Sequence, residues 1–439
     1  MLKTKRISKP IILLGVLLGS LIGFGAVLIP APEGIGLAGL SVFFIIVIFF
    51  VYWQPYPELR TVLISAFLLW AALALIHIFV FPLPDSQADA ISFELTGWKL
   101  AEGWRAGEFL ELITGAYFYS FIIGLVYYVL DRSPLFIQAL NVLFGTLLVY
   151  VVAVISRELF NSRVALLAAW VSCFFPACLL YSAITLREVA IVFPFALAIL
   201  YFIRWLKKTS RVYDLIKSAL CLFVSSLFHT GIIFLLGVLL LFWFYSNLDD
   251  FVRLRIRLFV VKALVGLLLL GILSIILTTG IGLEKVGGKV TQLLDPEYLG
   301  ARHKIQARGR AAYLTDLVIT SPTDLVHAVP LKIVYFLFAP FPWEITTLVD
   351  VVGMVDGLFY LGLIVAGVYG LLQIRRQHGK LVFWGLVLIL VTGIAIFAMG
   401  TGNYGTALRH RAKFVFLLIV LASPIMYGLW YWYVSKLKL

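Results

Sequence analysis

Long apolar runs separated by short polar turns make up most of the chain. A helix needs about 20 apolar residues to cross the hydrocarbon core of a bilayer. Thirteen candidate runs cover residues 11–29, 35–53, 61–82, 113–130, 134–155, 163–180, 188–204, 217–245, 258–280, 326–342, 353–373, 381–399 and 413–434. This pattern predicts an all-α polytopic membrane protein with about 11–14 transmembrane helices.

Two of the runs do not fit a simple crossing. The run 217–245 is long and is interrupted by the polar trio around His229, so it is either one tilted helix or a short hairpin. His229 itself is either a functional ionisable residue inside the membrane or a buried neutral histidine. The run 326–342 is short and contains Pro330, Pro340 and Pro342, so it need not cross the bilayer fully.

The composition agrees with a membrane protein. Apolar residues make up 62% of the 439 residues and charged residues 13%, whereas soluble domains carry about 25% charged residues. We therefore expect a single membrane domain, 1–439. Cys173, Cys178 and Cys221 form no CxxC pair or Cys/His cluster, which predicts packing roles and no metal site. P-loop, Rossmann, GxSxG and HExxH motifs are absent, and no nucleic-acid partner is expected.

Basic residues predict the orientation of the chain. They form four clusters, at 3–9, 204–217, 375–380 and 436–438. The positive-inside rule makes these clusters and both termini cytoplasmic, in an inner or plasma membrane, so that the loops 83–112 and 400–412 face outward. The hydrophilic loop 281–325 can lie on either side. Four runs separate the loop 83–112 from the cluster at 204–217, where an odd number is needed, so one must be re-entrant or wrongly assigned.

The first outer loop carries two candidate catalytic carboxylates, Asp85 and Asp89. Helical spacing predicts a short amphipathic helix in the membrane interface through Asp89, Phe93, Gly97, Leu100 and Gly103. A carboxylate at this position can act as a general base toward a hydroxyl acceptor, or bind a divalent cation. Alternatively, Asp85 caps the helix and Asp89 is a solvated loop residue.

The segment 176–188 places Tyr181, Ser182, Arg187 and Glu188 at one helix end between apolar runs. Arg187 can contact a phosphate at the membrane surface, because a guanidinium offers a planar fork of donors. Tyr181 and Glu188 are then candidate substrate contacts. The alternative is a neighbouring Arg–Glu pair at the interface.

The loop 400–412 is rich in glycine and arginine. Its glycines lead through Tyr404 into Arg409, His410 and Arg411. Basic residues outside the cytoplasm oppose the positive-inside trend, so we expect an anionic partner held by these side chains and by backbone N–H groups, with Tyr404 as a substrate contact. The alternative is that the basic residues extend to outer lipid headgroups.

The loop 281–325 and the break after it add three candidates. Arg308 and Arg310 bind an anion if the loop faces outward, and are ordinary topology signals if it faces inward. Trp343 follows Pro340 and Pro342 near the membrane edge. It is either an interfacial belt residue or a ring that stacks on a sugar face.

Residues of the first half are similar in type and order to those of the GT-C superfamily of polytopic glycosyltransferases. The resemblance covers about residues 80–205 and includes Asp89, Phe93, Gly97, Leu100, Gly103, Tyr117, Tyr119, Tyr127, Tyr128, Ser133, Pro134, Leu135, Asn141, the segment 156–163, Tyr181, Ser182, Arg187 and Glu188. Bacterial relatives of the dolichyl-phosphate-mannose protein mannosyltransferases resemble this chain most. The family usually has one span before the catalytic loop, whereas three runs precede it here, and a common Pro-Pro motif is missing.

The resemblance implies an inverting glycosyltransferase that works on the outer face in polysaccharide or glycoconjugate assembly. Its donor would be a sugar linked to polyprenyl phosphate, its base Asp89 with Asp85 as the fallback, and Arg187 would lie near the phosphate. The second half also resembles Wzy-type polymerases of undecaprenyl-diphosphate-linked repeats, for which Arg409 and Arg411 would hold the diphosphate. Membrane lipids and polysaccharide-assembly proteins are the expected partners. A transporter or flippase for a lipid-linked sugar is the alternative from another class, although internal repeats are not evident.

Overall fold

A computed structural model describes residues 9–30, 32–109, 112–113, 115–207, 212–252, 266, 271 and 295–436. These residues are mostly helical and contain no β-strand, only one isolated bridge. Six of their helices are long and apolar enough to cross a membrane, or seven if one bent pair is a single span. The prediction of an all-α polytopic membrane protein is therefore confirmed. The predicted run 258–280 lies outside the described residues, apart from two isolated positions.

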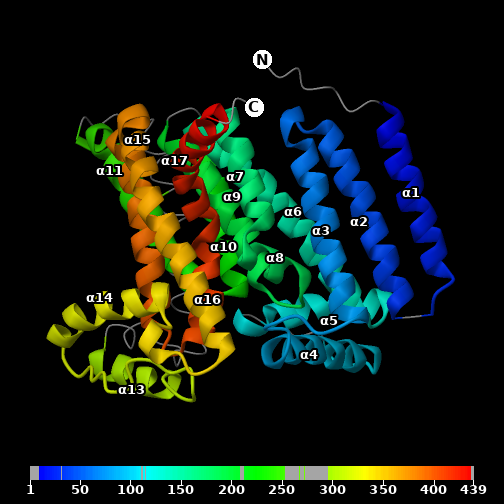
Figure 1. Ribbon diagram of the computed structural model, residues 1–439. Coiled ribbons are helices and arrows are strands. Elements are labelled where there is room, and N and C mark those ends of the chain that lie inside the picture. Colours follow the sequence, from blue (N-terminus) through cyan, green and yellow to red (C-terminus); the bar gives the residue numbers. More distant parts are fainter. Residues whose placement is uncertain are drawn as a thin grey trace. The chain divides into compact units, whose positions relative to one another are not determined.

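The helices form two compact units (Figure 1). The N-terminal unit comprises Met1–Arg157 and Asn161–Phe193, and the C-terminal unit comprises Glu158–Phe160 and Pro194–Leu439. The helix α9 (Glu188–Leu206) contributes to both. Each unit has its own candidate residues: Asp85, Asp89, Tyr181, Arg187 and Glu188 belong to the first, and the remaining candidates belong to the second.

In the N-terminal unit, three helices pack side by side (Figure 1). They are α1 (Lys9–Val27), α2 (Glu33–Trp53) and α3 (Arg60–Phe79), the last preceded by the turn η1 (Pro57–Leu59). The helix α6 (Pro134–Leu159) approaches α2 closely, because a Cβ atom at Gly36 or Gly39 would meet the side chains of Leu135 and Phe136. These helices are apolar around their circumference, as expected for helices that face both lipid and protein.

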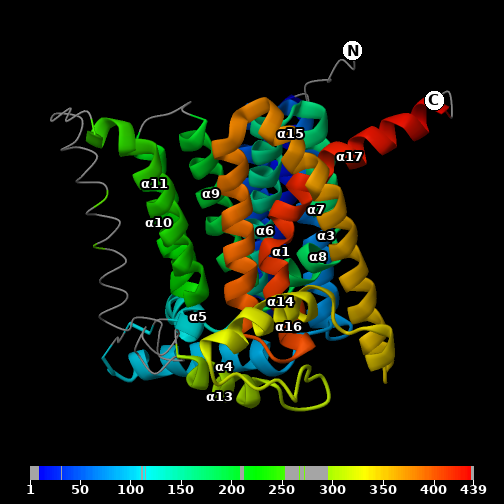
Figure 2. The ribbon, with the colours of Figure 1, turned by 90° about the vertical axis from the view of Figure 1, so that its left-hand side faces the viewer.

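The predicted helix of the first loop exists as α4 (Ala88–Arg105) and packs against α5 (Phe118–Leu130), which follows the turn η2 (Gly115–Tyr117). Both helices lie crosswise to α1–α3 (Figures 1 and 2). With 13 residues, α5 is about 20 Å long, which is too short to cross a bilayer. The run 113–130 is therefore not a span. Three crossings, the odd number that the basic clusters require, remain between the loop 83–112 and the cluster at 204–217 when the bent run 163–180 counts as one span.

The run 163–180 is broken in the structure. It consists of α7 (Ser162–Phe174) and α8 (Pro176–Ala183), whose axes differ by 58°. Phe175 has extended backbone angles, φ −66° and ψ 128°, because the residue before a proline disfavours the helical conformation. A second interruption, residues 184–187, separates α8 from α9. Irregular backbone at membrane depth is tolerated where protein surrounds it or where it lines a cavity.

In the C-terminal unit, the run 217–245 is a helical hairpin rather than one tilted helix. It consists of α10 (Val212–Phe228), the turn η3 (Thr230–Phe234) and α11 (Leu235–Val252), and the two helices contact each other. His229 occupies the N-cap of η3, where its ring accepts a hydrogen bond from the Gly231 N–H. The ring is half-buried, and its accepting nitrogen carries no hydrogen in this arrangement.

The two predicted runs 353–373 and 381–399 are the two arms of α15 (Leu348–Met399), which bends at Gly379 (Figure 2). Gly379 has φ 86°, a conformation that glycine adopts without steric cost. The exposed residues Arg375, Arg376 and Lys380 surround the bend. The helix α17 (Val415–Lys436) packs against α15 so closely that a Cβ atom at Gly370 would collide with the carbonyl of Leu421.

The remaining helices of this unit are short. They are α13 (Pro296–Gln306), α14 (Pro322–Phe338) and α16 (Tyr404–Arg411), with the turns η6 (Pro342–Glu344) and η7 (Ala412–Phe414). The helix α14 lies crosswise to α15 (Figures 1 and 2), and it is not among the helices that could span a membrane. The run 326–342 is thus not a crossing. After α14 the chain continues through a cis peptide bond at Ala339–Pro340.

Candidate functional site

An ion pair with a buried carboxylate fixes α4 in the N-terminal unit. The carboxylate of Glu94, 7% exposed, accepts hydrogen bonds from Arg132 Nε and Nη2, both at 2.9 Å, and from the Tyr127 hydroxyl at 3.0 Å. On the same face, Gly97 lies so close to α5 that a Cβ atom would meet Ile123. The helix is therefore held rigidly, and residues on its other face keep a defined position.

Asp89 lies on the exposed surface of the first turn of α4. A carboxylate there is favoured by the unpaired N–H groups at a helix N-terminus. The N-cap position belongs to Gln87, whose side chain forms no capping bond, so the alternative of Asp85 as the N-cap residue does not hold. Asp85 is exposed in the preceding turn with φ 60°.

The interruption between α8 and α9 is held by Asn141, a fully buried side chain of α6. Its amide Nδ2 donates to the carbonyl oxygens of Ile184 at 2.8 Å and Leu186 at 2.9 Å. An Asn amide has two N–H donors, and both are used in this way. The Tyr119 hydroxyl lies 3.0 Å from the same Nδ2 and 3.3 Å from the Asn141 carbonyl oxygen, to which it can donate. This network determines where the next residue, Arg187, leaves the broken segment.

Arg187 lies against α4. Its guanidinium carbon is 5.3 Å from the ring centroid of Phe93, within the range of a cation–π contact. Phe93 follows Asp89 by one helical turn. The two candidate residues, 98 positions apart by their numbers, are thus attached to the same short stretch of α4. Tyr181 and Glu188 are buried, 7% and 5% exposed, so they support the interruption rather than line an open surface.

In the C-terminal unit, the two hydrophilic loops are joined to each other. Ala312 and Asn403 form an isolated antiparallel bridge. The N–H of Tyr313 donates to Gly402 O at 3.1 Å, and the N–H of Tyr404 donates to Ala311 O at 2.9 Å. We call residues 307–314 and 401–404 the loop junction. The described part of the loop 281–325 therefore lies on the same side as the loop 400–412, which the sequence left open.

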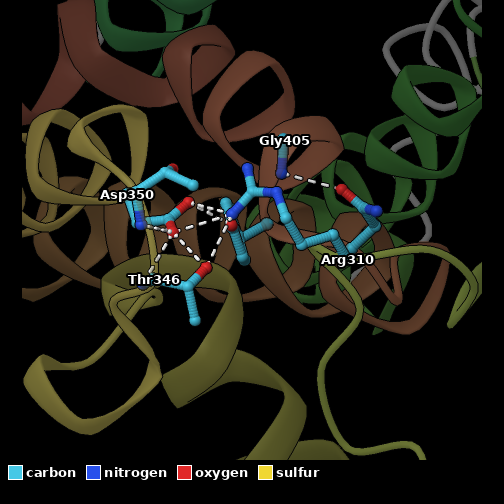
Figure 3. A network of polar contacts seen from close by, with 7 residues as sticks. Arg310, Thr346, Asp350 and Gly405 are labelled. Atoms are coloured by element: carbon cyan, nitrogen blue, oxygen red, sulfur yellow. Dashed lines mark hydrogen bonds and ion pairs between the residues drawn. The ribbon is translucent and has the colours of Figure 1, made fainter.

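Arg310 and Asp350 form the central contact beside this junction (Figure 3). Arg310 Nη1 lies 2.7 Å from each carboxylate oxygen, and Asp350 also accepts bonds from the backbone N–H groups of Thr346 and Thr347 and from the Tyr404 hydroxyl. Asp350 is fully buried, whereas the Arg310 side chain is 49% exposed. The exposed part of this guanidinium can meet an anionic ligand while Asp350 orients it.

Arg411 is fully buried and uses all five of its N–H donors inside the protein. Nε and Nη2 donate to Asp356 at 2.9 and 2.6 Å, Nη1 donates to the carbonyls of Leu337 and Ala339, and Nη2 also donates to the carbonyl of Gly353. A guanidinium has no further donor. In this structure Arg411 therefore anchors α16 internally, and its direct contact with a phosphate stays a prediction.

Arg409 and His410, by contrast, are partly exposed. The His410 ring packs edge-on against His229 at 5.1 Å and Phe397 at 5.3 Å, and its Nδ1 lies 3.2 Å from Thr401 Oγ1. Arg308 is exposed, and its carbonyl accepts a bond from Asn403 at the loop junction.

Lys413 was missed by the sequence analysis. It is fully buried and donates to the Arg409 carbonyl at 3.3 Å. The sequence did contain a signal for this residue, because basic side chains recur at every second position from Arg409 through Arg411 to Lys413.

Trp343 is 76% exposed and stacks on Phe341, with the ring centroids 5.0 Å apart. Two further apolar side chains, Leu348 and Val349, are exposed at the start of α15, after the exposed Thr346 and Thr347. This surroundings favours the interfacial belt role over a sugar-stacking role.

No group of three or more His, Cys, Asp or Glu side chains that could hold a metal ion occurs within the described residues. Comparison of the chain with protein-family models, with curated proteins and with solved structures finds no match.

Proposed function

We propose that this protein is a membrane glycosyltransferase that transfers a sugar from a polyprenyl-phosphate-linked donor to an acceptor on the non-cytoplasmic face. One observation carries the proposal: Arg187 is held 5.3 Å above Phe93, one turn of α4 from Asp89. A base for an acceptor hydroxyl and a cation for a leaving phosphate are then presented by adjoining parts of one unit. The product would enter cell-surface polysaccharide or glycoconjugate assembly.

In the proposed reaction, Asp89 accepts the proton of the acceptor hydroxyl as its oxygen bonds to the anomeric carbon of the sugar. The bond from this carbon to the phosphate oxygen breaks, and its electron pair stays on the polyprenyl phosphate. Arg187 stabilises the charge that develops there. Attack opposite the leaving phosphate inverts the anomeric configuration.

The test uses the purified chain in liposomes that contain a polyprenyl-phosphate-linked sugar. Asp89→Asn and Arg187→Ala should retain expression and lose sugar transfer by 100-fold or more, of the order expected for loss of acid–base or charge stabilisation. Glu102→Gln, on the exposed surface of the same helix, is the matched control and should keep activity. Full activity of Asp89→Asn would remove this residue as the base, and loss in Asp85→Asn alone would transfer the role to Asp85.

A second candidate function is polymerisation of undecaprenyl-diphosphate-linked repeats. It is favoured by the gathering of Arg409, His410, Arg310 and Lys413 around α16 and the loop junction, since a diphosphate needs more than one cation. Arg409→Ala should then reduce the product ladder to single repeats, whereas Arg376→Ala, at the exposed bend of α15, should leave it intact. An unchanged ladder in Arg409→Ala would count against polymerisation.

The proposed location is the inner or plasma membrane, with both termini cytoplasmic. The same liposomes separate transfer from transport. A flippase would move the lipid-linked sugar between leaflets without consuming it, whereas a transferase would release polyprenyl phosphate.

A further inference from the structure

A lysine and a histidine form a buried pair between α13 and α14, apart from the residues discussed so far. Lys332 Nζ lies 2.9 Å from His303 Nδ1, and the two side chains are 0% and 1% exposed. A buried lysine is normally paired with a carboxylate. Within the part of the chain that the structure describes, no carboxylate forms an ion pair with Lys332.

The hydrogen bonds determine the state of the imidazole. His303 Nε2 lies 2.8 Å from the carbonyl oxygen of Leu314. A carbonyl only accepts, so Nε2 carries the hydrogen, and in the neutral ring Nδ1 is the acceptor. The amine of Lys332 donates to it. A protonated His303 would instead direct an N–H at the donating amine, so the pair requires an uncharged imidazole.

Leu314, the residue that His303 contacts, has an unusual backbone. Its φ is 54°, a left-handed conformation that residues with a side chain rarely adopt because Cβ approaches the following carbonyl oxygen. Its neighbour Tyr313 donates from its backbone to Gly402 and from its hydroxyl to the Thr401 carbonyl. Leu314 is therefore the last residue of the first segment of the loop junction, residues 307–314, and it lies four residues after Arg310.

We propose that His303 and Lys332 are a positioning pair that holds the loop junction closed, and that protonation of His303 releases it. That the pair keeps the loop junction closed follows from the structure alone and does not depend on the proposed function. Its consequence for the binding of a lipid-linked donor, through Arg310 and Arg308, rests on the proposed function.

Burial and the neighbouring positive charges lower the pKa of both members of the pair. Burial lowers the pKa of His303, and Lys332 lowers it further although the bond to Leu314 opposes this. Burial and then Arg302 lower the pKa of Lys332 to about 7. The charged residues of the helices packed on α14 are engaged elsewhere, Asp350 with Arg310 and Asp356 with Arg411, and the basic residues Arg409, His410 and Lys413 follow on α16 and η7.

The pH dependence follows from proton uptake. Below the ordinary histidine pKa of 6.5, the unfolded chain binds a proton at His303 that the folded pair resists, so the stability of the pair falls as pH falls. Lys332 acts the same way at higher pH: between 10.5 and about 7, only the unfolded chain carries its proton. The junction should therefore be firmest above neutral pH and loosen below about pH 6.

The test is hydrogen–deuterium exchange of the full chain in lipid nanodiscs from pH 8 to pH 5, corrected for intrinsic exchange. Peptides that cover 307–314 and 401–404 should exchange at least tenfold faster at pH 5.5 than at pH 8, while peptides of α17 remain protected. Lys332→Met removes the donor and should open the junction at every pH. Lys332→Gln keeps an uncharged N–H donor and should preserve it. Lys304→Gln, exposed on α13 beside His303, should match the unsubstituted chain.

Two outcomes would overturn the proposal: corrected exchange that does not change between pH 8 and pH 5, or protection in Lys332→Met equal to that of the unsubstituted chain. If Lys332→Met also exposes α17, the variant has unfolded globally, and the pH series on the unsubstituted chain decides. The measurement needs no substrate, so failure of the proposed glycosyl transfer would not affect it.

Discussion

Two arginine–carboxylate pairs, one in each unit, show how differently the same contact can be used. Arg132 and Glu94 join α4 to the start of α6, and the Arg132 side chain is 40% exposed. Arg411 and Asp356 join α16 to α15, and the Arg411 side chain is fully buried. Water can solvate the first arginine if the pair opens. The second has only protein groups around it, so three backbone carbonyls take the place of water.

Because of this difference, we expect the loss of the Arg411 pair to destabilise its unit more than the loss of the Arg132 pair destabilises the other unit. The Arg132 pair holds a helix whose other residues, Asp89 above all, are the candidates for chemistry. The Arg411 pair holds the residues before and after it, Arg409, His410 and Lys413. Asp89, Arg409 and His410 are at least partly exposed, and in each unit a buried or half-buried arginine keeps their helix in position.

The largest effect is expected from Arg411→Ala. The substitution leaves Asp356, whose side chain is only 15% exposed, without its partner and removes the Arg411 donors to three carbonyls, so we expect a loss of about 3–5 kcal/mol in the free energy of unfolding. Thermal unfolding in detergent measures it. Replacing both partners, Arg411→Met with Asp356→Leu, should recover most of the loss. Equal stability of Arg411→Ala and the unsubstituted chain would contradict the role of this pair.

Asn141→Ala tests a neutral anchor of the N-terminal unit. The carbonyl of Leu186 would lose the Asn141 donor, and that of Ile184 would keep only the Leu186 N–H, so we expect a loss of about 2–3 kcal/mol in the free energy of unfolding. Gln138, one turn earlier on α6, is the comparison, because its amide donates one longer bond, 3.3 Å, to Thr185 Oγ1 in the same interruption, and its carbonyl oxygen is buried without a hydrogen-bond partner among the described residues. Gln138→Met should therefore change the stability by less than about 1 kcal/mol. A larger loss in Gln138→Met than in Asn141→Ala would reverse this assignment.

Glu94→Gln should cost less, about 1–2 kcal/mol, because the partner Arg132 is partly solvated and the amide oxygen can still accept from it. Salt separates the two ion pairs further. Raising the ionic strength should shrink the effect of Glu94→Gln and leave that of Arg411→Ala nearly unchanged, since buried charges are screened much less. The same thermal measurements at low and high salt provide the comparison.

Trp343→Ala should have the smallest effect on stability, about 0.5 kcal/mol or less, because the side chain is mostly exposed. Its effect on function distinguishes the two roles considered for the indole. If Trp343 is a belt residue, its substitution should change the relative affinity of the protein for thin and thick bilayers and leave the KM for an acceptor unchanged. A raised KM with unchanged membrane behaviour would indicate a sugar contact instead.

Features set by local sequence were predictable. The helix α4 follows from the spacing of Phe93 and Gly97, and the bend of α15 follows from the basic residues between two apolar runs. The broken span was only partly visible, since Pro176 marks its position but not its angle. The run 113–130 was wrongly predicted to be a span because its residues are as apolar as those of a span. In the structure α5 packs against α4 and lies crosswise to α1–α3.

Contacts between distant residues were not predictable. Asp350 and Asp356 were not singled out, because their partners Arg310 and Arg411 are 40 and 55 positions away. The same applies to the joining of the two hydrophilic loops, which no local pattern signals. Arg411 shows the consequence: in sequence it looks like the neighbouring Arg409, and only the packing of α16 against α15 makes one internal and the other partly exposed.

The loop junction also constrains how the protein is made. Tyr313 and its partner Thr401 are separated by 88 residues, which a ribosome adds in roughly 4–18 s at about 5–20 residues per second. During that interval Tyr313 has been synthesised but the turn that pairs with it has not. Nascent chains that stop before residue 401 should therefore expose the segment 307–314 to proteases, and chains that extend well past residue 404 should protect it.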